Sequence, residues 1–166
     1  MRINNIELDQ VEESRKKATI NHNSLPSIRT IEGRFSLDKS PMFSAGIGTE
    51  KSSFVLGCDE PGILGGQGIL PTPLTYLLFG VMSCYASTLA MQCALDGITL
   101  SDLGLTGKLH YDLGPVVTGE NMPIIRKLEL QVHSSMNLGP EIEKARKRCP
   151  AVFAIENPIE TEIRQS

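Results

Sequence analysis

The sequence predicts an α+β fold in which antiparallel strands surround one long, buried helix. Residues 61–95 contain no Asp, Glu, Lys or Arg, although charged residues make up 21% of the chain. Apolar and polar residues alternate in two later segments, 103–113 and 125–133, as in strands with one face against a core. Strand-like segments precede the uncharged block, and helical segments follow the later strands. This order of elements is typical of an α+β fold.

The composition limits the class of protein. A chain of 166 residues, 40% hydrophobic and with a net charge of −3, is long enough for one domain and too apolar to be disordered. It has no strong basic run, so we expect no nucleic-acid partner. The first residues, Met-Arg-Ile-Asn-Asn-Ile-Glu, lack the apolar core of a signal peptide, and we therefore expect a cytoplasmic protein.

The uncharged block is long enough to cross a bilayer, since about 20 apolar residues suffice. Acidic residues flank it, however, where membrane helices usually carry Lys or Arg. Its helical part also contains polar side chains, namely Thr75, Ser83, Ser87, Thr88 and Gln92. We therefore predict a helix buried inside a soluble assembly, with no membrane partner.

Residues 1–27 are predicted to form an N-terminal helical extension and a polar linker, followed by a single domain over residues 28–166. Asn4 and Glu7 have the spacing of a capping box, which predicts a helix over the first 18 residues. The apolar stripe of this helix is thin, so we expect it to pack on a larger body. The stripe consists of Leu8, Val11 and Ala18.

The first part of the predicted domain contains short strands and a long loop. Strands are expected at 28–35, 42–47 and 52–56, separated by the turn residues Lys-Ser-Pro and Gly-Thr-Glu-Lys. Residues 57–73 form a loop rich in Gly and Pro. Its glycines match neither the Walker nor the G-x-G-x-x-G phosphate motif, so we interpret them as residues that shape the backbone.

Thr72-Pro73 predicts the start of the central helix, which continues to about Leu95 before Gly97 ends it. Small residues on this helix would allow a second helix to approach closely; they are Gly80, Ser83, Ala86, Ser87 and Ala90. The alternating strands 103–113 and 125–133 follow, joined by a turn through 114–122. Helices are expected from Pro140 to Arg148 and from Pro150, and a last strand over 159–163.

The four cysteines fall in different settings. Cys84 and Cys93 lie on the central helix and point about 180° apart, roughly 13 Å along its axis, so they cannot form an intrachain disulfide. We interpret Cys93 as a small buried hydrophobe, and Cys58 has no evident partner. Cys149 falls between two predicted helices, where free amides and nearby cations favour a thiolate. The chain has no C-x-x-C and no paired histidines, so we expect no metal.

An ordered set of segments resembles the OsmC/Ohr family, that is, the organic hydroperoxide resistance and osmotically inducible protein C-like proteins. The segments are Leu-Pro-Thr-Pro-Leu-Thr-Tyr-Leu-Leu-Phe-Gly-Val-Met-Ser-Cys at 70–84, Ala-Leu-Asp-Gly-Ile-Thr-Leu at 94–100 and Arg-Cys-Pro-Ala-Val at 148–152. Asp59-Glu60-Pro61 with Gly65-Gly66 resembles a loop found in part of that family. The resemblance covers about residues 28–163.

The resemblance implies an intertwined homodimer in which sheets from both chains wrap two central helices. It further implies a cysteine-based peroxidase that reduces organic hydroperoxides without a cofactor. Cys84 would be the peroxidatic cysteine and Cys149 the resolving cysteine. The oxidised Cys84 would condense with Cys149 to a disulfide, which a dithiol reductant of lipoyl type or similar would reduce.

The family also uses an arginine from an early strand to hold the thiolate. Arg34 is the best match for this residue and Arg29 the reserve. A glutamate that orients the arginine in the Ohr branch is replaced here by Leu74, which calls peroxidase activity into question. Asp59 or Glu60 from the preceding loop could serve in its place.

The missing glutamate keeps a second function open. The chain would then be a non-peroxidase dimer that binds a small hydrophobic or sulfur-containing ligand at its interface. The expected pocket for that ligand is lined by Leu74, Leu77, Leu78 and Met82.

Overall fold

A computed structural model describes residues 1–165. The chain forms two compact units. The first contains residues 1–24, 80–109 and those from 127 onward, and the second contains residues 25–79 and 110–126. The predicted mixture of helices and antiparallel strands is confirmed. The predicted single domain over 28–166 stays a prediction.

The chain begins with a β-hairpin where the sequence predicted a helix. β1 (Arg2–Ile3) pairs antiparallel with β2 (Ile6–Glu7), and α1 (Leu8–Ile20) starts only after them. The capping-box prediction was therefore wrong, and no side chain caps this helix. Asn4 and Asn5 have φ of 52° and 65°, the left-handed backbone that a two-residue hairpin turn requires and that Asn tolerates better than most residues.

The side chain of Asn4 anchors this hairpin to the end of the central helix. Its amide nitrogen donates to the carbonyl oxygens of Ala90 and Ile98 at 3.3 and 2.8 Å. Its amide oxygen accepts from the N–H of Leu100 at 2.8 Å. By contrast, α1 itself has no fully buried residue, and its half-buried positions are the predicted stripe of Leu8, Val11 and Ala18.

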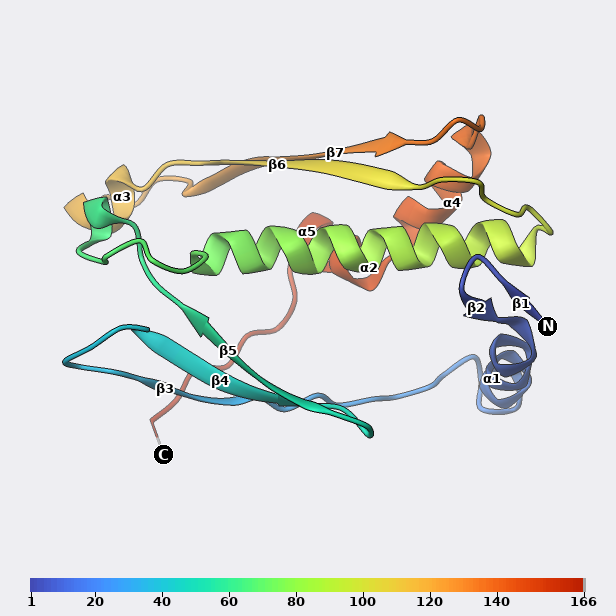
Figure 1. The fold of residues 1–166 in the computed structure, drawn as a ribbon, viewed down its shortest axis with the longest axis horizontal. Coiled ribbons are helices and arrows are strands. Elements are labelled where there is room, and N and C mark those ends of the chain that lie inside the picture. Colours follow the sequence, from blue (N-terminus) through green and yellow to red (C-terminus); the bar gives the residue numbers. More distant parts are fainter. Residues whose placement is uncertain (166) are drawn as a thin grey trace. The chain divides into compact units, whose positions relative to one another are not determined.

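The second unit contains an antiparallel three-stranded sheet in the order β3 (Glu32–Phe35), β4 (Phe43–Gly48) and β5 (Ser53–Cys58), labelled in Figure 1. Glu32 pairs with Gly46, and Gly48 pairs with Ser53, so the turn after β4 closes a regular hairpin. The predicted first strand was too long, because residues 28–31 lie outside the sheet.

The loop after β5 is built around Asp59, which is fully buried. The carboxylate accepts hydrogen bonds from Ser40 Oγ at 3.2 Å and from the N–H groups of Glu60, Gln67 and Ile69 at 3.0–3.4 Å. A short 3-10 helix, η1 (Gly62–Leu64), follows. Gly66 passes so near Glu60 that a Cβ there would lie 1.9 Å from its carbonyl oxygen. These contacts support the interpretation of a loop whose glycines shape the backbone.

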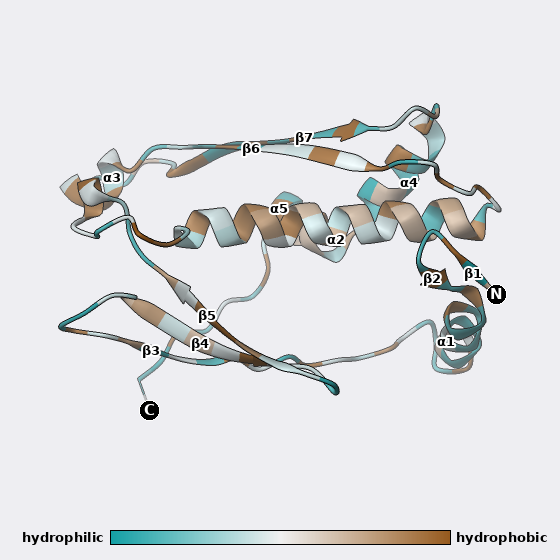
Figure 2. Ribbon diagram, viewed as in Figure 1, coloured by the Kyte–Doolittle hydropathy of each residue, from teal (hydrophilic) through white to brown (hydrophobic). Residues whose placement is uncertain are grey.

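The central helix α2 (Pro73–Leu95) has the predicted boundaries and continues from the second unit into the first. The N–H of Thr75 bonds to Thr72 Oγ at its start, and Gly97 has the left-handed φ of 75° just after its end. Figure 2 shows that α2 is largely hydrophobic, whereas α1 is largely hydrophilic.

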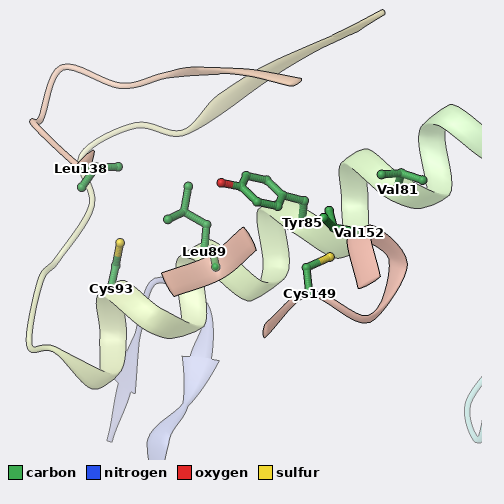
Figure 3. Close-up of a cluster of buried hydrophobic side chains, with 8 residues drawn as sticks. Val81, Tyr85, Leu89, Cys93, Leu138, Cys149 and Val152 are labelled. Atoms are coloured by element: carbon green, nitrogen blue, oxygen red, sulfur yellow. The ribbon is translucent and has the colours of Figure 1, made fainter. Parts of the chain in front are cut away.

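Every fourth residue of the later part of α2 enters the core of the first unit. This row consists of Val81, Tyr85, Leu89 and Cys93, none more than 4% exposed. It packs with Leu138, Ala145, Cys149 and Val152 (Figure 3). α2 is long and apolar enough to cross a membrane. It carries the buried polar residues Thr88 and Gln92, both of which are hydrogen-bonded.

β6 (Gly104–Tyr111) and β7 (Ile125–His133) pair as a second sheet, which runs beside α2 in Figure 1. The predicted turn between them contains a short helix, α3 (Gly114–Thr118). α4 (Gly139–Arg148) and α5 (Pro150–Glu156) follow as predicted. The prediction of a strand over 159–163 was wrong. These residues are exposed and pair with no sheet edge in the described chain, and an alternating pattern forms a strand only where a partner strand is available.

Asn4→Gly is expected to reduce the free energy of unfolding by about 1–3 kcal/mol, since it removes the partners of three backbone groups in a half-buried place. Glycine keeps the left-handed turn in either position, so Asn5→Gly is the matched control. The exposed side chain of Asn5 bonds to Arg2 alone among the residues that the structure describes. Urea unfolding of both variants measures the difference. Equal losses would contradict the anchoring role of Asn4.

Candidate functional site

The first unit brings together two cysteines that are 65 residues apart in sequence. The Sγ atoms of Cys84 on α2 and Cys149 at the α4–α5 junction lie 3.5 Å apart. Both are free thiols; Cys84 is half-buried and Cys149 is fully buried. Two sulfur atoms at this distance need to approach by about 1.5 Å to reach the length of a disulfide bond.

The residue after Cys149 explains why the chain turns there. Pro150 disfavours helical backbone at the preceding residue, and Cys149 accordingly has φ −75° and ψ 117°. Cys149 is both the C-cap residue of α4 and the N-cap residue of α5. Its N–H bonds to the carbonyl of Ala145 at 2.8 Å, and its carbonyl accepts from the N–H of Phe153 at 2.9 Å. The predicted position of Cys149 between two helices is therefore confirmed.

The surroundings of Cys84 within its own unit disfavour the thiolate. Burial raises the pKa of the Cys84 thiol above its usual value, and the neighbouring Cys149 raises this pKa further. The backbone N–H of Ala151 bonds to the sulfur and lowers the pKa, but by less than burial raises it. Among the described residues, no Lys or Arg contributes to this balance. The described residues therefore supply no positive charge that favours the Cys84 thiolate.

Two side-chain hydrogen bonds fasten α4 to α2 around the cysteine pair. Tyr85 Oη donates to the carbonyl of Ile142 at 3.1 Å. Arg148 Nη1 donates to Oε1 of Gln92, whose side chain is only 2% exposed. Sequence reasoning missed these contacts. A usable signal was present, because Gln92 is a polar residue four and eight positions after Thr88 and Cys84 in an otherwise uncharged, largely apolar block.

The two arginine candidates lie outside the first unit. Arg34 is on β3, opposite Ser44, and Arg29 precedes that strand; both are exposed. Neither forms an ion pair with any residue that the structure describes. Arg34 borders a hollow of about 540 Å³ with Glu32, Ser44 and Val55. The assignment of either arginine to the site stays a prediction.

The candidates for the missing glutamate differ in their freedom. Leu74, which occupies the family position, is half-buried in the first turn of α2. Asp59 is committed to its loop by the four hydrogen bonds described above. Glu60 is half-buried, and its backbone N–H rather than its carboxylate bonds to Asp59. Of the two substitutes, Glu60 therefore has the carboxylate more available to an arginine.

The other two cysteines, Cys93 and Cys58, have no cysteine partner among the described residues and differ from the pair in their surroundings. Cys93 is fully buried in the core, which confirms it as a packing residue, and burial raises the pKa of its thiol. Cys58 ends β5, where burial first and the acidic neighbours Glu60 and Asp59 second raise the pKa of its thiol. Within residues 1–165, no group of three or more potential metal ligands occurs.

A largely apolar cavity of about 490 Å³ lies in the second unit. Aromatic and aliphatic side chains of the three-stranded sheet line it together with residues that precede and start α2; they include Phe35, Met42, Phe43, Leu56 and Tyr76. Cys58, Asp59 and Glu60 stand at its border. None of the four residues expected to line a ligand pocket, Leu74, Leu77, Leu78 and Met82, contributes to this cavity.

Comparison with known proteins identifies similar sequences and folds. The family described as OsmC-like protein matches residues 65–164, which include both cysteines of the pair. No curated protein matches the chain.

Several solved structures share the fold. An organic hydroperoxide resistance protein OsmC of Legionella pneumophila is 20% identical with a TM-score of 0.56, over 78% of this chain and 91% of that one. An OsmC-like protein of Mycoplasma pneumoniae is 19% identical with a TM-score of 0.57, over 81% and 91%. An organic hydroperoxide resistance protein of Elizabethkingia anophelis is 20% identical with a TM-score of 0.56, over 82% and 94%. At such identities the likeness concerns the fold.

Proposed function

The chain belongs to the OsmC-like protein family, and from this premise we propose that it is a thiol-dependent peroxidase that reduces organic hydroperoxides with Cys84 and Cys149. The observation that carries the proposal is the 3.5 Å distance between the two sulfur atoms. Two of the similar structures are organic hydroperoxide resistance proteins, which agrees with this substrate class.

The proposed cycle uses only thiol chemistry. The Cys84 thiolate attacks the terminal oxygen of the hydroperoxide, the O–O bond breaks, and the alkoxide leaves as an alcohol after taking a proton. Cys84 is then a sulfenic acid. The Cys149 sulfur attacks the Cys84 sulfur, the S–O bond breaks, and the hydroxide takes the thiol proton and leaves as water. A dithiol reductant of lipoyl type or similar restores both thiols through a mixed disulfide. No cofactor or metal takes part.

Arg34 supplies the positive charge in this proposal. The pKa of Cys84 is raised by its own unit, so an added guanidinium is needed to favour the thiolate. Arg34 is exposed on β3 and has no ion-pair partner among the described residues, which leaves its five N–H donors available. Arg29 is the reserve, and Glu60 would orient the arginine in place of the family glutamate.

The active form is proposed to be an intertwined homodimer in the cytoplasm. One face of α2 consists of small residues that the chain leaves uncovered: Gly80, Ser83 and Ser87 are exposed, and Ala86 and Ala90 are half-buried. Leu77 and Phe79, earlier on the helix, are 40% and 66% exposed. A second copy would cover this apolar surface and allow close packing of the two central helices.

A second function has one observation in its favour. The apolar cavity of the second unit is large enough for a small hydrophobic or sulfur-containing ligand. In that case the chain would be a non-peroxidase dimer. Wild-type protein that consumes no hydroperoxide, together with undiminished ligand binding by Cys84→Ser, would favour this alternative.

The peroxidase cycle predicts which thiols a hydroperoxide consumes. Cumene hydroperoxide should join Cys84 to Cys149 in the reduced wild type, with the mass loss of two hydrogens detected by mass spectrometry. Cys84→Ser should abolish peroxide consumption. Cys149→Ser should allow a single turnover that ends at a trapped sulfenic acid. Cys58→Ser is the matched control and should behave as wild type, since that residue lies in the other unit. A disulfide between other cysteines would refute the mechanism.

The arginine assignment predicts a change in pH dependence. In Arg34→Ala, the rate at which iodoacetamide alkylates Cys84 should rise about tenfold for each pH unit between pH 7 and pH 9. A thiol with a raised pKa is still gaining thiolate throughout this pH range. Wild type should react faster at pH 7 and with a flatter profile. Arg29→Ala is the comparison. If neither variant differs from wild type in rate and slope, no early-strand arginine serves Cys84.

The dimer predicts the mass of the particle in solution. Light scattering at micromolar concentration should give twice the 18.1 kDa of one chain. Phe79→Glu, which places a charge on the exposed apolar part of α2, should shift the mass toward one chain. A stable monomer of the wild-type protein would contradict the architecture.

A further inference from the structure

The junction between α4 and α5 has to hold Cys149 in place while the sulfur of Cys84 changes its chemical state. The backbone of Cys149 is bound on both sides, to Ala145 in α4 and to Phe153 in α5, so its sulfur moves only as far as the two helices allow. The position of this helix pair relative to α2 therefore decides how often the two sulfur atoms meet.

Apolar packing and an ion pair between Lys144 of α4 and Asp96, directly after α2, hold the helices together, and two hydrogen bonds to side chains of α2 act nearest the cysteines. Tyr85 holds the middle of α4 through the carbonyl of Ile142, and Gln92 holds its last residue, Arg148. Arg148 is the residue directly before Cys149, so its anchor acts one peptide bond away from the reacting sulfur. Cys84, Thr88 and Gln92 follow one another at intervals of four along α2, so the anchor and the first cysteine share one row of a rigid helix.

Gln92 is otherwise a costly residue at this place. Its side chain is 2% exposed, and a buried amide requires hydrogen bonds that an apolar side chain would not. Its Oε1 accepts from the guanidinium of Arg148, a charged donor. Arg148 is itself exposed apart from this contact, and it is not among the groups that shift the pKa of Cys84. The pair is therefore placed to act on the position of Cys149 and not on the reactivity of Cys84.

We propose that Gln92 and Arg148 form a positioning pair for the resolving step, which keeps Cys149 within reach of the oxidised Cys84. The inference rests on the proposed function and states which of its two steps the pair affects. The pair leaves the attack on the hydroperoxide unchanged and accelerates the formation of the Cys84–Cys149 disulfide. Without it, the sulfenic acid persists and a second hydroperoxide oxidises it to the sulfinic acid.

The test separates the two steps in a single turnover of the full-length reduced protein with excess cumene hydroperoxide. Dimedone traps the sulfenic acid, and mass spectrometry of quenched samples counts sulfenic, disulfide and sulfinic forms with time. In Gln92→Leu and Arg148→Gln, the loss of the Cys84 thiol should stay within about twofold of wild type. Disulfide formation should slow by about tenfold or more, because displacement of a reacting atom by about 1 Å can cost up to about a hundredfold in rate.

Three further variants control the test. Lys147→Gln removes the adjacent positive charge, whose side chain forms no hydrogen bond or ion pair with the described residues, and should leave both steps unchanged. Gln92→Glu keeps an acceptor for Arg148 and Arg148→Lys keeps a cationic donor, so both should recover most of the disulfide rate. Circular dichroism and thermal melting check that each variant is folded. The inference is overturned if both steps slow in parallel, or if disulfide formation stays within twofold of wild type in both disruptive variants.

A second oxidant distinguishes failure of the inference from failure of the proposed function. Diamide accepts the Cys84 thiolate across its N=N bond, and Cys149 then displaces the hydrazine product to form the same disulfide. If the wild-type protein does not react with hydroperoxide, the proposed peroxidase function is refuted. The positioning pair still predicts a tenfold slower second step with diamide in Gln92→Leu and Arg148→Gln. Equal rates with diamide would refute the positioning pair alone.

Discussion

An uncharged helix of 23 residues has to be covered, and much of the structure follows from that requirement. In the later part of α2, one row of residues at intervals of four meets the core formed with α4, α5 and the second sheet. Complete burial of Leu89, Cys93, Ala145 and Cys149 shows how tightly this side is packed. The cysteine pair lies within that packing, so the distance between the sulfurs is a consequence of how α4 and α5 cover α2.

Apolar packing brings the helices together, but polar contacts determine where along α2 the other segments lie. An apolar row offers many nearly equivalent positions, whereas a buried amide or hydroxyl has only a few partners within reach. Tyr85, Gln92 and Asn4 each bond across to a segment distant in sequence. Asp59 does the same for the loop before α2 in the second unit. These four residues make the packing specific.

The parts of the fold that local sequence determines were predictable. Thr72-Pro73 and Gly97 mark the ends of α2, and the alternation of polar and apolar residues over 127–133 marks most of β7. The prediction failed where a local pattern fits two structures. Asn4 and Glu7 have the spacing of a helix cap, but Asn4-Asn5 also suits a tight hairpin turn. The hydrogen bonds from Asn4 to residues 90–100 favour the hairpin. Residues 159–163 alternate, yet no sheet edge is available to them in the described chain. The candidate site divides in the same way. The pairing of Cys84 with Cys149 came from family resemblance, and the polar Gln92 in an uncharged block indicated a buried contact without identifying Arg148 as its partner.

The burial that holds the two cysteines together also opposes the chemistry proposed for them. The same packing that places Cys149 against Cys84 raises the pKa of the Cys84 thiol, and the Ala151 amide offsets only part of that effect. Among the described residues, no Lys or Arg lowers this pKa. The proposal therefore assigns the activating charge to Arg34, a residue of the second unit.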